Sequence, residues 1–270
     1  MLGRWVLFLA LGLAAMPAGA ETTLTGRFEQ AGLVRGQTSP GTTVLLDSRP
    51  VPVDGGGHFL LGFARDAAAT STLTIHNREG AEEVRSLSIA RRDWAVQRIE
   101  GLPRDKAAPD PAAVARILAE AEMLRTLRAK ITTAAMFLDG LIRPADGIVS
   151  GVFGSQRVYN GTPGAPHSGL DIAAPSGSPV RAAADGVVVL AAPDLFLTGK
   201  TVMIDHGLGL MSSYAHLSRI DVEAGARVGR GETIGAIGAT GLATGAHLHW
   251  GLSWLDTRLD PEAGLAALGR

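Results

Sequence analysis

The sequence contains no cysteine among its 270 residues. This absence excludes disulfides, zinc ribbons, iron–sulfur clusters and thiol catalysis, so any metal site must use His, Asp or Glu. An excess of charge of one sign is also missing: the formal net charge is −1, which argues against a basic face for nucleic acid. Charged residues make up only 19%, whereas hydrophobic residues make up 46%. That balance excludes a disordered or collagen-like chain and supplies enough apolar material for a sizeable core.

Long hydrophobic runs are absent beyond the N-terminus. Arg4 precedes an apolar run over residues 5–16, and Ala18-Gly19-Ala20 matches the small-residue pattern of a signal-peptidase site. The run is shorter than the roughly 20 residues that span a bilayer. We therefore predict a signal peptide over residues 1–20, cleaved after Ala20, and export to the periplasm or cell envelope. After cleavage no stable membrane insertion is expected; an uncleaved anchor is the alternative.

The sequence pattern of the remaining chain predicts mainly β-strands. Short alternating runs separated by Gly-rich turns predict a small β-sandwich accessory domain over residues 21–100. A Pro-rich linker and an amphipathic helix follow over residues 101–146, with Asp110-Pro111 as the helix start. Strand-like segments return over residues 147–262 and predict an all-β domain, which leaves residues 263–270 as a C-terminal tail. The expected fold is thus two β domains joined by a linker and one helix.

Five of the seven histidines fall between residues 167 and 249. His167 and Asp171 lie four apart in an extended segment, so both side chains are expected on one side, with room for an ion beside Gly169. His247 and His249 alternate on a predicted strand and share one face. A catalytic zinc needs three N or O ligands and an open position, and His167, Asp171 and one of the two paired histidines supply that set.

Two further histidines stand near this group in the sequence. His216 ends the strand-like run Ser213-Tyr214-Ala215, and a hydrogen-bonded core or edge histidine would be the ordinary interpretation of it alone. His206 precedes a glycine at a predicted strand end, and we interpret it as a turn residue and not as a ligand. Histidines close to a metal-activated water can act in acid–base catalysis or donate hydrogen bonds.

The motifs HSGLD, YAHL and GAHLHW, in this order, resemble the lysostaphin-type (LytM-like) zinc endopeptidases of peptidoglycan. The resemblance covers roughly residues 147–262. It implies an open-groove β domain, one Zn²⁺ per chain bound by His167, Asp171 and His249, and a catalytic pair formed by His216 and His247. All five positions are filled, unlike those of regulatory relatives with degenerate sites.

The resemblance implies an exported zinc metalloendopeptidase that hydrolyses peptide bonds of peptidoglycan. Peptidoglycan peptides are then the expected partners, and no nucleic acid is expected. Two alternatives stay open: a non-catalytic peptidoglycan-binding regulator that activates another wall hydrolase, and a structural-zinc or adhesion protein. A structural site would need a fourth protein ligand, for which His216 is the candidate.

Overall fold

The computed structural model describes residues 22–99, 111–159 and 161–269. The predicted signal peptide and most of the predicted linker lie outside these residues. In chain order the elements are β1 (Thr23–Gly26), β2 (Leu33–Gln37), β3 (Thr43–Leu46), β4 (Arg49–Val51), β5 (His58–Gly62), β6 (Thr70–His76), β7 (Glu82–Ser88), β8 (Val96–Ile99), α1 (Pro111–Arg128), β9 (Ile148–Gly151), β10 (Gln156–Tyr159), β11 (Thr162–Pro163), β12 (Leu170–Ala173), β13 (Pro179–Arg181), β14 (Gly186–Leu195), β15 (Gly199–Gly207), β16 (Leu210–Ile220), β17 (Arg227–Val228), β18 (Thr233–Ile237), β19 (His247–Trp254), β20 (Thr257–Leu259) and α2 (Pro261–Leu268).

The N-terminal β region consists of two antiparallel sheets, ordered β1-β2-β5 and β4-β3-β6-β7. Their strands alternate as a half-buried sheet should; in β6, for example, every second residue is buried. The C-terminal region is one ten-stranded sheet whose main path runs β17-β14-β15-β16-β19-β12-β9. The prediction of a mainly β fold with an N-terminal β region is confirmed.

The two β regions share one continuous apolar core. At Gly62 in β5 a Cβ atom would lie 3.0 Å from the Trp254 ring and 3.1 Å from Leu259, so the two regions are in close contact at this glycine. Strand β8 extends this junction, because it pairs in parallel with β10, with Val96 opposite Gln156. The N-terminal β domain is therefore docked on the larger sheet.

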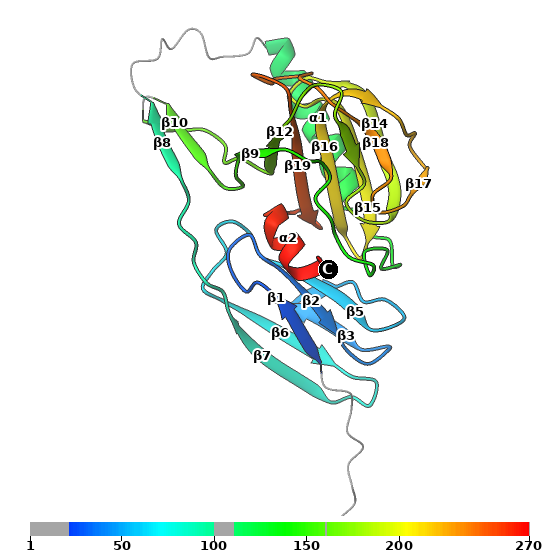
Figure 1. The fold of residues 1–270 in the computed structure, drawn as a ribbon. Coiled ribbons are helices and arrows are strands. Elements are labelled where there is room, and N and C mark those ends of the chain that lie inside the picture. Colours follow the sequence, from blue (N-terminus) through cyan, green and yellow to red (C-terminus); the bar gives the residue numbers. More distant parts are fainter. Residues whose placement is uncertain (1–21, 100–110, 160, 270) are drawn as a thin grey trace, which may run out of the picture.

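Helix α2 lies between the two regions (Figure 1). Asp260 caps it by accepting a hydrogen bond from the Glu262 N–H, and Pro261 occupies its first turn. Residues 263–268, which we expected as a tail, form most of this helix and bury Ala263, Ala267 and Leu268. The sequence Asp260-Pro261 is the same start signal that predicted α1, so local information for α2 was present.

Helix α1 has the five turns expected, but it buries no side chain. Of the predicted apolar stripe, Ile117 and Leu124 are half-buried, whereas Leu118 is 64% exposed. Polar contacts hold the helix to the sheet instead: Arg116 pairs with Asp194, and Glu120 accepts from the Phe196 N–H. No helix in the described part of the chain is long and apolar enough to cross a membrane.

A buried polar chain ties β15 and β16 to the connection between β13 and β14. The Tyr214 hydroxyl accepts a hydrogen bond from the Ala183 N–H at 2.8 Å and lies 2.9 Å from Ser212 Oγ. Ser212 Oγ is 2.7 Å from His206 Nε2, and His206 Nδ1 donates to the Asp185 carbonyl at 2.8 Å. His206 is 0% exposed, and its burial lowers the pKa of its imidazole, which is therefore neutral and structural.

We expect Tyr214→Phe to lower the free energy of unfolding by about 1–3 kcal/mol, because it leaves the buried Ala183 N–H without an acceptor. Denaturant unfolding of the metal-free protein measures this difference. The control is Ser86→Ala, which removes a hydroxyl at an exposed position of β7 and should change the free energy by no more than about 0.5 kcal/mol. Equal stability of the two variants would contradict the structural role of the buried chain.

Candidate metal centre

The pairing of β12 with β19 assembles the site. Asp171 lies directly opposite His249, and Ala173 lies opposite His247. Along β19 the two histidines are half-buried, whereas Leu248 and Trp250 between and after them are fully buried on the other face. The strand alternation therefore turns both imidazoles to the face that carries Asp171.

Three ligand atoms converge at this point. His167 Nε2, Asp171 Oδ1 and His249 Nδ1 are separated by 3.0 Å, 3.1 Å and 2.9 Å. Four-coordinate zinc with ligand bonds of about 2.0–2.1 Å places its ligand atoms roughly 3.3 Å apart, so small side-chain rotations accommodate the ion. Within the described ranges these residues form the one group of three or more acidic or histidine side chains with this geometry. The residues present fit zinc.

Two glycines make room for the ligands. A Cβ atom at Gly151, opposite Asp171 on β9, would lie 2.4 Å from the Asp171 carboxylate. A Cβ atom at Gly169 would lie 2.8 Å from His249 Nε2. The space beside Gly169, which we expected to hold an ion, is therefore taken by the imidazole of His249. Both glycines serve the ligands, and the ion position lies among the three side-chain atoms.

Burial and hydrogen bonds set the charge state of the ligands. At His167, burial alone would lower the pKa, but hydrogen bonds with Asp171 and the Val152 carbonyl, together with the Asp171 charge, raise it above its ordinary value. Burial would raise the pKa of Asp171, yet hydrogen bonds from both imidazoles hold it well below its usual range. At His249 burial dominates and lowers the pKa despite the bond to Asp171. The carboxylate is thus ionised, and a cation at this point replaces protons held between the three groups.

His216 and His247 lie next to the ligand group. Their ring centroids are 4.8 Å apart, and the His216 ring is 6.1 Å from that of His249. His216 Nδ1 donates to the Thr240 carbonyl at 2.8 Å, and His247 Nδ1 donates to the Gly245 carbonyl at 2.9 Å. In the neutral state, each ring therefore keeps an unprotonated Nε2.

An unusual backbone conformation brings His216 to this face. Its neighbour Ala215 pairs with His249, so strict alternation would turn His216 toward the core. His216 instead has a φ of 61°, and the register of β16 shifts between Leu217 and Arg219. A left-handed conformation at a non-glycine residue is costly and is concentrated at functional sites. Here it interrupts the alternation and lets the ring meet His247.

The other histidines lie apart from this centre. His58 Nδ1 is 3.0 Å from Asp54 in the N-terminal domain, His76 lies 3.5 Å from Glu82, and His206 belongs to the buried chain described above. The rings are oriented by groups that the sequence did not predict, the backbone carbonyls of Val152, Thr240 and Gly245. Backbone carbonyls leave no signal in residue identity, so no sequence pattern could have singled them out.

Comparisons with known proteins match this part of the chain. The model of peptidase family M23 matches residues 165–261. Peptidoglycan DD-endopeptidase ShyA from Vibrio cholerae is 48% identical over 88 residues, which cover 33% of this chain and 20% of the relative. DD-carboxypeptidase/endopeptidase Mpg from Neisseria meningitidis is 48% identical over 84 residues, which cover 31% of this chain and 19% of the relative. The alignments thus span about a fifth of the length of these curated relatives.

A solved structure extends the likeness to both β regions. A crystal structure from Pseudomonas aeruginosa, described as an M23 peptidase, has a TM-score of 0.68 and 29% identity, and the match covers 90% of this chain and 97% of that chain. The family model matches a stretch that contains Asp171 and His216 as well as His247 and His249. Residues 165–261 of this protein are a domain of peptidase family M23.

Proposed function

We propose that this protein is an exported zinc metalloendopeptidase that hydrolyses peptide bonds of peptidoglycan. The observation that carries the proposal is the convergence of His167 Nε2, Asp171 Oδ1 and His249 Nδ1 within 3.1 Å of one another, with two further imidazoles beside them. The named activities of the relatives, a peptidoglycan DD-endopeptidase and a DD-carboxypeptidase/endopeptidase, support the substrate class. The proposal includes removal of residues 1–20 and action in the periplasm or cell envelope.

In this proposal His167, Asp171 and His249 hold one zinc ion per chain. Zinc bound there supplies a Lewis acid that lowers the pKa of water toward about 7 and polarises the scissile carbonyl. His216 and His247 are not needed as ligands, because a catalytic site keeps an open position. The hydrogen bond from His167 Nδ1 to the Val152 carbonyl holds that ring with Nε2 toward the ion position.

His216 and His247 carry the proton transfers. Their Nδ1 atoms are committed to backbone carbonyls, so the lone pair of each Nε2 is free to accept a proton from the attacking water. The water oxygen forms the new bond to the carbonyl carbon, the C–N bond breaks, and the proton passes from an imidazole to the leaving amine. Either ring, once protonated, can also donate a hydrogen bond to the negative charge that develops on the carbonyl oxygen.

We expect His167→Ala, Asp171→Ala and His249→Ala each to weaken zinc binding strongly, because three ligands leave none to spare. Elemental analysis after dialysis against a weak chelator measures the zinc content per chain. His76→Ala is the control, since His76 lies on β6 of the N-terminal domain and should leave one zinc bound. Full zinc content in any of the three ligand variants would show that the ligand set is wrong.

We expect His216→Ala and His247→Ala to retain zinc but to cleave purified peptidoglycan at least about a hundredfold more slowly, the scale of an acid–base group. Mass spectrometry of the released fragments identifies the bond cut by the unmodified protein. Zinc content and turnover are measured on the same preparation. Zinc lost in step with activity would make that histidine a ligand, whereas peptidoglycan binding without any cleavage by the unmodified protein would favour the non-catalytic regulator.

Two separate effects of acid are expected. Protons compete with zinc for His167, whose pKa is raised in the metal-free site, so zinc affinity should begin to fall while the pH is still above about 6.5. At His216, burial first and then the neighbouring imidazole charges outweigh the hydrogen bond to Thr240 and lower the pKa. Protonation of this group therefore reduces turnover only below about pH 6.5. Chelator competition measures the zinc affinity against pH, and turnover at saturating zinc is measured over the same pH range. If the zinc affinity and the turnover fell at the same pH, this expectation would be contradicted.

A further inference from the structure

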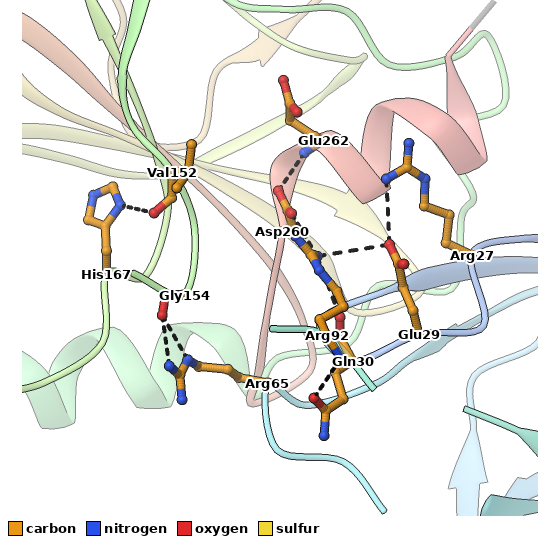
Figure 2. A network of polar contacts seen from close by, with 10 residues as sticks. All are labelled: Arg27, Glu29, Gln30, Arg65, Arg92, Val152, Gly154, His167, Asp260 and Glu262. Atoms are coloured by element: carbon orange, nitrogen blue, oxygen red, sulfur yellow. Dashed lines mark hydrogen bonds and ion pairs between the residues drawn. The ribbon is translucent and has the colours of Figure 1, made fainter. Parts of the chain in front are cut away.

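The loop of residues 152–155 brackets His167 with backbone hydrogen bonds. The Gly154 N–H donates to the His167 carbonyl at 2.8 Å, and the His167 N–H donates to the Ser155 carbonyl at 2.8 Å. His167 Nδ1 also donates to the Val152 carbonyl at 2.9 Å (Figure 2). His167 lies before the first residue of β12, so this loop, and not a regular strand ladder, positions its backbone and its ring.

A side chain from the N-terminal domain holds the same loop. Arg65, in the connection after β5, donates from Nε and Nη2 to the Gly154 carbonyl at 3.0 Å and 2.8 Å (Figure 2). A paired hydrogen bond from one guanidinium is charge-assisted and restricts the direction of the carbonyl as well as its position. Gly154, which is hydrogen-bonded to His167, is therefore held by a residue 89 positions earlier in the chain.

Packing around Trp94 limits the movement of this loop further. Gly154 has a φ of 78°, and a Cβ atom there would lie 2.2 Å from the Trp94 ring. The Trp94 ring packs edge-on against Phe153, with centroids 6.0 Å apart, and the Arg65 guanidinium lies 4.9 Å from the Trp94 ring. Phe153 itself is 4% exposed. The loop therefore packs closely against the Trp94 ring, which belongs to the N-terminal half of the chain.

The N-terminal domain is itself anchored to the large sheet. Arg92 pairs with Asp260 at 2.8 Å (Figure 2). The Asp260 N–H donates to the Ala31 carbonyl at 3.0 Å. Together with the close contact at Gly62 and the shared apolar core, these bonds fix the position of the N-terminal domain on the large sheet. Arg65 therefore connects the N-terminal domain to the loop of residues 152–155, which is hydrogen-bonded to His167.

We propose that Arg65 is a positioning residue for His167, and that through it the N-terminal β domain sets the metal affinity of the site. The inference rests on the proposed function, because it takes His167 as a ligand. Without Arg65 the Gly154 carbonyl loses two hydrogen bonds, and the loop that orients His167 gains freedom. Outer contacts of this kind change metal affinity by about 10–100-fold when removed.

The test measures the zinc dissociation constant of the full chain by chelator competition. Arg65→Ala should weaken binding about tenfold or more, and Arg65→Lys, which keeps the charge and one donor site, should fall between Arg65→Ala and the unmodified protein. The matched control is Arg85→Ala, which removes an arginine bond to the Thr22 carbonyl of 2.8 Å in the N-terminal domain and has no link to the loop. Arg85→Ala should bind zinc normally.

A second measurement follows the ring itself in the metal-free protein. Nuclear magnetic resonance of the His167 imidazole should show faster exchange of the Nδ1 proton in Arg65→Ala than in Arg85→Ala, because the bond to the Val152 carbonyl is released. A mere loss of stability would not single out this proton. If Arg65→Ala does not fold, Arg65→Lys takes its place in both measurements.

The outcomes separate this inference from the proposed function. An unmodified protein that binds no zinc contradicts the proposed function, and the Nδ1 signal still tests the positioning role. Normal zinc binding by the unmodified protein, with an affinity for Arg65→Ala within twofold of it, overturns the role of Arg65 alone. An equal loss of affinity in Arg85→Ala would indicate general destabilisation and would overturn it as well.

Discussion

The register between β12 and β19 is the constraint on which the metal centre depends. It places Asp171 directly opposite His249, with Asp171 Oδ1 2.9 Å from His249 Nδ1. Because side chains alternate along a strand, a slip of one residue would turn both histidines of β19 into the core and expose Leu248 and Trp250. Those two residues are fully buried, so the burial of apolar surface maintains the register that the polar site requires.

Backbone carbonyls orient the imidazoles that surround this pair. His167, His216 and His247 each use Nδ1 to donate to a carbonyl, and Nε2 of His167 and of His247 lies 3.0 Å and 3.9 Å from Asp171 Oδ1. The carbonyl at Thr240 is held in turn, since its hydroxyl donates to the Leu217 carbonyl and accepts from the Lys200 N–H. The geometry of the site thus depends on loops whose own positions are determined by hydrogen bonds further out.

The contact between the two β regions also contributes to the hydrogen bonds that position the imidazoles. Helix α2 and the close approach at Gly62 join the two regions through one apolar core, while Arg92 and Arg65 add polar links at its edge. Of these links, the one from Arg65 ends on the loop of residues 152–155, which is hydrogen-bonded to His167. The N-terminal β region is therefore linked by hydrogen bonds to the candidate metal centre.

Much of the fold and the residue types of the site could be predicted from local patterns. The strand-like segments predicted over residues 147–262 include those that form β14, β15, β16, β18 and β19, and the spacing of His247 and His249 predicted a shared face. The helix start at Asp260-Pro261 was equally local but was overlooked. Alternation could not predict where His216 points, because a positive φ and a register shift interrupt the regular strand there.

The sequence by itself determined which donors are available: histidines and one carboxylate, without cysteine, on segments that form strands. The residues alone left open whether His247 or His249 joins His167 and Asp171. Only the tertiary structure placed His249 opposite Asp171 and His247 opposite Ala173, because pairing between strands about eighty residues apart depends on the packing of the whole sheet. The same holds for Arg65, whose contact with Gly154 exists only after the two β regions have docked.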